Sequence, residues 1–159
     1  MLTSVRYRWF VCLIAAAQAS AQCPVTLPAS SPVTVPGQPS NAFQAWYGSD
    51  ALAVLLPADG RWRGMGKEHR FRDKFWVWRR GYDVETEARP ALTFQGVELR
   101  DGGEPRRLEP SPATNAYGNG WSSMLALLEF PAAGCWRVTA SYVHEGIEQQ
   151  LAFTVEVIE

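Results

Sequence analysis

The sequence predicts an all-β protein, an antiparallel β-sandwich that follows a cleaved signal peptide. Three observations support this prediction. Short runs rich in branched and aromatic residues alternate with turn residues from position 50 onward. No apolar pattern with a 3.6-residue period is long enough for a helix of several turns. The 21 N-terminal residues have the charge and hydropathy profile of a secretory leader.

Residues 1–21 contain the three parts of a signal peptide. Arg6 and Arg8 precede an apolar stretch at 9–17, and Ala19-Ser20-Ala21 forms a small-x-small cleavage site. The apolar stretch is shorter than the about 20 residues that a membrane-spanning helix needs. We therefore expect cleavage after position 21 and a mature protein in the periplasm or outside the cell.

The mature chain has the size of one domain. Its 138 residues carry 13 basic and 16 acidic side chains, a formal charge of −3. This balance does not suggest a nucleic-acid partner. No later segment has the length and hydropathy of a membrane span, and the sequence leaves the oligomeric state open.

Two cysteines remain after the leader, Cys23 and Cys135. An even pair of thiols in an oxidising compartment predicts one disulfide, with two free buried thiols as the alternative. The bond would close a loop of 113 residues, counting both ends, worth on the order of 4 to 5 kcal/mol in unfolded-chain entropy. Lipid attachment at Cys23 is disfavoured, because Gln22 rather than a small residue precedes it.

A proline-rich extended lead-in, 22–40, precedes the sandwich domain at 41–159. Its five prolines remove amide donors, and the segment 32–36 could add a short edge strand. Turn residues then separate six expected strands, at 50–56, 71–80, 91–99, 122–130, 135–143 and 147–157. The segment 113–121 is expected as a long connection that covers one end of the sandwich or forms a binding tip.

The last two strands show which side chains face the core. Odd positions from Leu151 to Val157 are apolar, and so are even positions from Trp136 to Tyr142. Cys135 has the opposite parity to Trp136. The disulfide is therefore expected to join the lead-in to the start of a strand, outside the core.

Part of this region resembles a known fold. The sequence Glu-Phe-Pro-Ala-Ala-Gly-Cys-Trp-Arg-Val-Thr at 129–139 resembles the corner between strands E and F of immunoglobulin-like domains. More widely, Tyr-Gly-Ser-Asp-Ala-Leu-Ala-Val at 47–54, Phe-Trp-Val-Trp-Arg-Arg-Gly-Tyr-Asp at 75–83, and 130–138 are similar to segments of a group of uncharacterised exported bacterial proteins. The resemblance implies an immunoglobulin-like β-sandwich without an assigned activity, so it supplies no catalytic residues.

The strand near 71–80 is the strongest candidate for a binding surface. The window 61–80 has a local charge of +6, whereas the rest of the mature chain carries −9. If Phe71, Phe75 and Val77 face the core, the other parity presents basic residues and two tryptophans. These candidates are Arg72, Lys74, Trp76, Trp78 and Arg80. Exposed tryptophans beside arginines suit sugar rings, aromatic ligands or a protein partner. The alternative is a core tryptophan with ordinary solubilising charges.

No motif in the sequence forces a catalytic, metal or cofactor chemistry. His69 and His144 lack zinc-ligand spacing, and His144 is expected as a turn residue. Asp83, Glu85 and Glu87 could offer carboxylates to calcium, but a solvated acidic loop is preferred because further oxygen ligands are missing. The sequence contains neither a Gly-x-Ser-x-Gly motif nor a Cys-x-x-Cys pair.

The function expected from the sequence is an exported, non-enzymatic module that binds an envelope partner, either a protein or an anionic glycan. Two other classes remain open. One is an envelope-glycan hydrolase that acts through Asp and Glu carboxylates, whose separation in space the sequence does not give. The other is a purely structural envelope domain.

Overall fold

The computed structural model describes residues 22–38, 40–64, 71–100, 106–118 and 121–159. The predicted signal peptide at 1–21 and His69 lie outside these ranges. Within them, no helix has the length and apolar character needed to cross a membrane.

The described chain is all-β. Its elements are a short 3-10 turn at Pro28–Ser30 and the strands β1 (Gln44–Gly48), β2 (Ala53–Pro57), β3 (Arg61–Trp62), β4 (Arg72–Trp78), β5 (Ala91–Glu98), β6 (Arg107–Gly118), β7 (Trp121–Glu129), β8 (Gly134–His144) and β9 (Ile147–Val157). The predicted all-β class and the six predicted strands are confirmed, with ends shifted by a few residues. The short strands β1 and β3 and the long strand β6 were not predicted.

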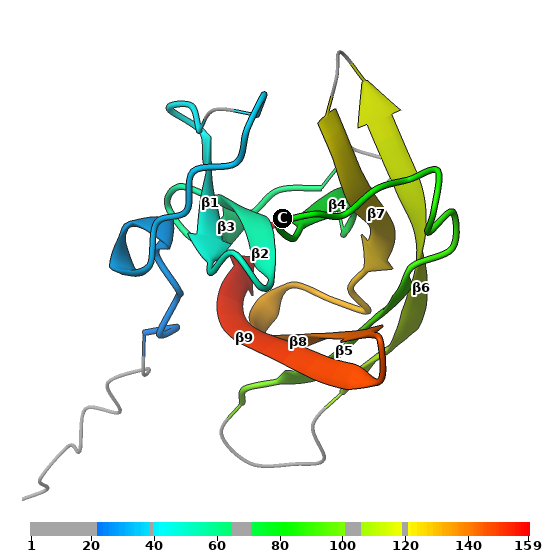
Figure 1. Cartoon of the computed structure of the whole chain (residues 1–159). Coiled ribbons are helices and arrows are strands. Elements are labelled where there is room, and N and C mark those ends of the chain that lie inside the picture. The colour runs from blue at the N-terminus through cyan, green and yellow to red at the C-terminus, as the bar shows by residue number, and fades with distance from the viewer. Residues whose placement is uncertain (1–21, 39, 65–70, 101–105, 119–120) are drawn as a thin grey trace, which may run out of the picture.

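The strands form two facing sheets of a sandwich-like fold. Their order is β1-β2-β4-β7-β6-β5-β8-β9-β3, and every neighbouring pair is antiparallel except β3 and β9. The first sheet contains β1, β2, β4 and β7, and the second contains β5, β8, β9 and β3. The long strand β6 passes from one sheet to the other (Figure 1), since it pairs with β5 up to Pro112 and with β7 from Ala113.

The course of β6 corrects the prediction that 113–121 is a long connection. Residues 113–118 belong to β6 and pair with β7 instead. Pro110 and Pro112 argue against a strand in the sequence, because proline removes a ladder donor. They lie where the strand bulges and changes its partner, so the missing donors are tolerated there.

The core between the two sheets is rich in aromatic side chains. Phe75 of β4 stacks on Trp62 and on Phe153, with ring centroids 5.2 Å apart in both pairs, and meets Phe94 edge-on. The alternation predicted for the last two strands is confirmed. Trp136 and Tyr142 are fully buried, as are Val138 and Ala140 between them, and three of the four odd positions from Leu151 to Val157 are buried.

The lead-in packs along the outside of β1 (Figure 1). The Val33 amide donates to the Trp46 carbonyl across 3.3 Å, and the Gly48 amide donates to the Ser31 carbonyl across 3.1 Å. The expected strand at 32–36 forms only isolated bridges. A second small apolar cluster lies under this segment, and its buried members are Val35, Trp46, Ala53 and Trp78.

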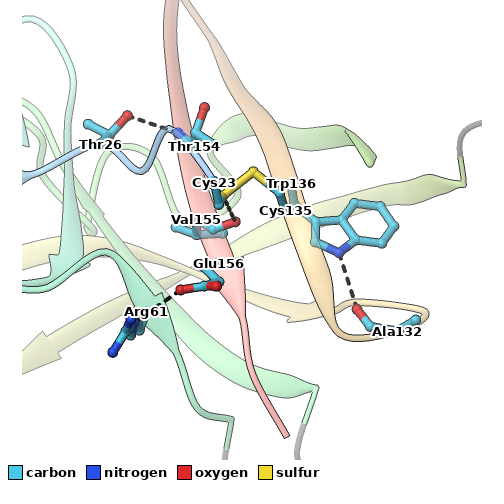
Figure 2. Close-up of a disulfide and its surroundings, with 9 residues drawn as sticks. All are labelled: Cys23, Thr26, Arg61, Ala132, Cys135, Trp136, Thr154, Val155 and Glu156. Atoms are coloured by element: carbon cyan, nitrogen blue, oxygen red, sulfur yellow. Dashed lines mark hydrogen bonds and ion pairs between the residues drawn. A yellow bond between two sulfur atoms is a disulfide. The ribbon is translucent and has the colours of Figure 1, made fainter. Parts of the chain in front are cut away.

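The start of the lead-in is attached to β8 and β9 of the second sheet. Cys23 and Cys135 form the predicted disulfide, with 5.4 Å between their Cα atoms (Figure 2). Beside it, the Thr26 amide donates to the Thr154 carbonyl, and the Thr154 amide donates to Thr26 Oγ1. Cys135 is partly buried, while its neighbour Trp136 is fully buried. The disulfide therefore joins the lead-in to the first residues of β8 outside the core, as predicted.

Candidate functional site

Strand β4 separates its side chains by parity, as the sequence predicts. Phe75 and Val77 are 1% and 0% exposed in the main core. Trp76 and Trp78 point to the opposite face, but they are not equally accessible. Trp78 is only 9% exposed and belongs to the small cluster beneath the lead-in, whereas Trp76 is partly buried against that cluster. The predicted second exposed tryptophan is therefore covered, because the lead-in packs on this part of the sheet.

Most of the described basic side chains in the window 61–80 pair with acids from other parts of the chain or from the adjoining turn. The described pairs are Arg61–Glu156, Arg63–Asp59, Arg72–Glu129, Arg79–Glu87 and Arg80–Asp50. Lys74 is exposed and forms no ion pair with a described residue. Among the described residues of this window, most of the positive charge is therefore paired with carboxylates.

An apolar patch with one cation remains on the outer face of the first sheet. In the ladder between β4 and β7, Trp76 lies opposite Leu125, and Lys74 lies opposite Leu127. Residues opposite each other in an antiparallel pair project to the same face. Leu127 is 39% exposed, and Trp76 and Leu125 are partly exposed. We call Lys74, Trp76, Leu125 and Leu127 the Trp76 face.

A polar network at one end of the sandwich is the clearest cluster of chemically active side chains in the described chain. Arg79 follows β4, Glu87 lies in the next connection, and Tyr142 and His144 end β8. Arg79 Nε donates to the Tyr142 hydroxyl across 2.7 Å, and that hydroxyl donates to Glu87 Oε2 across 2.7 Å. Arg79 Nη2 lies 3.3 Å from Glu87 Oε2 and 3.2 Å from both ring nitrogens of His144.

Burial controls the electrostatics of this network. Burial raises the pKa of Tyr142 to about 12, and the hydrogen bond to Glu87 acts in the same direction. Burial and the negative charge of Glu87 also raise the pKa of Tyr82 to about 12. Burial opposes the charge of Arg79, but its bonds to Tyr142 and Glu87 outweigh that effect, and the Arg79 pKa is raised.

This arrangement is that of a structural clamp. Both tyrosines stay protonated at neutral pH, and the charge of Arg79 is balanced by a carboxylate at 3.3 Å. Tyr82 adds a hydrogen bond from its hydroxyl to the Glu87 carbonyl. The network therefore fixes the connection between β4 and β5 to the end of β8.

The acidic residues considered for calcium do not converge. Glu87 turns inward to Arg79, whereas Asp83 Oδ1 accepts the Glu85 amide and shapes the turn. Within the described ranges, no group of three or more His, Cys, Asp or Glu side chains is placed to hold a metal ion. The interpretation of 83–87 as a wholly solvated acidic loop is also incomplete, since the Glu87 side chain is 20% exposed.

This network has no direct signature in the sequence, which predicts His144 only as a turn residue. The His144 side chain is 41% exposed and stacks beside the Tyr142 ring. The one local signal is the apolar parity of β8, which places Tyr142 inside and requires a partner for its hydroxyl. The identity of that partner depends on the path of the 79–90 segment.

Comparison with known proteins adds little to this all-β description. No family model matches the chain, and no curated protein matches it. Among solved structures, the chain is similar to a DUF4426 family protein from Pseudomonas aeruginosa. That match has 13% sequence identity and a TM-score of 0.45, and it covers 72% of this chain and 94% of the other.

Proposed function

We propose that this chain is an exported, non-enzymatic binding module of the cell envelope that captures a protein partner on the Trp76 face. The observation that carries the proposal is the patch itself, in which a tryptophan, two leucines and a lysine without an ion pair to any described residue project together from neighbouring strands. Partly exposed tryptophan surrounded by aliphatic side chains is typical of energetically dominant interface residues. Lys74 favours a partner with an acidic group next to its apolar contact.

Two features support the proposal of export, and a third supports that of an immunoglobulin-like type. The sequence at 1–21 has the pattern of a cleaved leader, and a disulfide between Cys23 and Cys135 is suited to an oxidising compartment. The corner at 129–139 leads into β8 with Trp136 fully buried, in keeping with the immunoglobulin-like pattern. N-terminal sequencing of the protein secreted by producing cells should begin at Gln22, and an intact leader would contradict export.

Position-specific crosslinking tests the binding surface. A photoreactive amino acid at Leu127 should capture one protein in producing cells, whereas the same group at Val143 should not. Val143 is a matched control because it is 42% exposed, close to the 39% of Leu127, and belongs to the second sheet.

The captured protein is then purified and titrated against the mature chain by calorimetry. Leu127→Asp together with Lys74→Glu should weaken binding by more than about tenfold, as expected for hot-spot residues, while Val143→Asp should leave it unchanged. Equal capture at both positions, or unchanged affinity of the Leu127 and Lys74 variant, would reject the Trp76 face as the docking surface.

A further inference from the structure

A second surface, on the outer face of the other sheet, has a different chemistry. A shallow depression of about 320 Å³ lies across β6, β5 and β8. Its polar lining consists of Gln95, Arg107, Glu109, Arg137 and Thr139, and Val97 lies among them. We call this depression the arginine groove.

Two arginines flank the middle strand of the groove. Val97 of β5 lies opposite Arg107 on β6 and opposite Arg137 on β8, so all three side chains project to the same face. Neighbouring strands are about 4.8 Å apart, which places the two arginine backbones roughly 10 Å apart. Both arginines are exposed, and neither forms an ion pair with a described residue. As far as the described residues go, two guanidinium groups are therefore available to one ligand.

The remaining lining suits hydroxyl groups. Gln95 lies opposite Thr139, and the exposed Glu109 completes the same end of the groove. An amide and a hydroxyl both donate and accept hydrogen bonds, whereas a carboxylate only accepts them. Sugar hydroxyls can satisfy all three groups at once.

A β-bulge explains why the surface is hollow here. Phe94 pairs with Ser111 and Gly96 with Leu108, so two residues of β6 face the single residue Gln95. A bulge bends its strand and turns a side chain away from the regular ladder. Gly96 lies at the same place, where the Cβ of any other residue would come within 3.1 Å of the Arg137 carbonyl oxygen. The hollow shape of the groove is therefore set by the backbone, and it is present before any ligand binds.

From this geometry we propose that the arginine groove binds an acidic polysaccharide through the carboxylate of a uronic acid unit. The charged lining residues are two arginines and Glu109, so the groove has a net charge of +1. This charge matches a monoanionic carboxylate on a hydroxyl-rich ring. Arginine forms strong paired hydrogen bonds with carboxylates. Glu109 repels a phosphate dianion more strongly than a monoanionic carboxylate, and it accepts hydrogen bonds from sugar hydroxyls. The site is independent of the Trp76 face, since it belongs to the second sheet.

Oligogalacturonate provides the probe, with the same oligosaccharide reduced to the neutral sugar as its matched comparison. Titration of the mature protein should show binding of the acidic form that weakens with salt, and about tenfold or more weaker binding of the neutral form. Arg107→Gln with Arg137→Gln should reduce the affinity about a hundredfold, near tenfold for each charged hydrogen-bonding group. Arg107→Lys with Arg137→Lys should retain part of the affinity, because it keeps the charge and loses the paired geometry.

The control variant removes the same charge elsewhere. Arg80→Gln with Arg89→Gln replaces two exposed basic residues outside both the groove and the Trp76 face, and it should bind the probe as the unaltered protein does. The proposal is overturned if this control loses as much affinity as the groove variant, if the neutral oligosaccharide binds equally, or if inorganic polyphosphate binds as tightly as the oligogalacturonate. Absence of probe binding overturns it as well. None of these results bears on protein capture at Leu127.

Discussion

Arg79 Nε donates a hydrogen bond to the Tyr142 hydroxyl across 2.7 Å, although the two residues are 63 positions apart in the chain. The same hydroxyl donates to Glu87. One buried oxygen thus connects the end of β4, the following connection and the end of β8. Its removal is the most direct test of the clamp.

Tyr142→Phe should lower the free energy of unfolding by about 1–3 kcal/mol, because the substitution leaves Arg79 and Glu87 without their shared partner. Denaturant unfolding measures the change. Tyr47→Phe is the control, since the Tyr47 hydroxyl takes no part in this network. A loss below about 0.5 kcal/mol in Tyr142→Phe, within the ordinary range for surface substitutions, would show that the network does not stabilise the fold.

The alkaline limit of stability should depend on the same tyrosines. Tyr82 and Tyr142 have pKa values of about 12 in the folded protein, above the value of about 10 for an unfolded tyrosine. Their contribution is complete below pH 10 and is lost as the pH rises toward 12. The unfolding free energy should therefore fall between about pH 10 and 12, and less steeply in Tyr142→Phe. Identical slopes in the variant and the unaltered protein would contradict this assignment.

The acid limit should depend on Asp59. The hydrogen bond from Arg63 lowers the Asp59 pKa from 3.8 to about 2, with a further bond from the Arg61 amide. This contribution is present above about pH 4 and disappears as the pH falls to 2. Asp59→Asn should thus show a smaller drop in melting temperature between pH 5 and 2 than the unaltered protein. Glu85→Gln, at an exposed position, serves as the control and should follow the unaltered protein.

Loss of the disulfide should have the largest effect. Cys23→Ser with Cys135→Ser should lower the unfolding free energy by about 4–5 kcal/mol, the expectation for a loop of this length. Amide hydrogen exchange at Thr26 and Thr154 should accelerate, because the bond holds these two residues together. A reductant should reproduce the change in the unaltered protein and have no effect on the variant. Unchanged exchange at both amides would show that the lead-in docks without the bond.

Alanine substitutions at two glycines with similar φ angles, Gly60 and Gly146, distinguish the cost of backbone strain from the cost of a packing clash. Gly60 has φ +71°, and a Cβ added there would lie 2.6 Å from Val25, whereas Gly146 has φ +77° and open space around that position. Gly146→Ala should cost only the backbone strain, on the order of 1 kcal/mol. Gly60→Ala should cost clearly more, because Val25 of the lead-in must move. Equal melting temperatures for the two variants would mean that Val25 does not pack on this turn.

The order of strands in the sequence was easier to predict than their partners. Alternation in β8 and β9 identified Trp136, Tyr142 and Val155 as core residues, because a two-residue period is a local property. The sequence did not predict β6, because Pro110 and Pro112 argue against a strand. They are tolerated there because they lie at the bulge and at the change of sheet.

The candidate sites depend on contacts between distant residues, which local patterns do not contain. The basic window around Arg72 looked like a positive surface until folding placed Glu129 and Asp50 beside it. Trp78 looked exposed until the lead-in covered it. Parity correctly predicted the face of each tryptophan, but coverage of that face requires knowledge of another segment.

The lead-in covers the edge of a strand in each sheet. Ser31 and Val33 bond to β1, and Thr26 bonds to β9. Uncovered strands of this kind offer free amides and carbonyls to any neighbouring chain. A newly synthesised chain in which Cys23 and Cys135 are still reduced would expose these strand edges to neighbouring chains. Aggregation during purification should therefore depend on the oxidation state of the two cysteines. Reduced samples should aggregate, and samples oxidised in air should stay in solution.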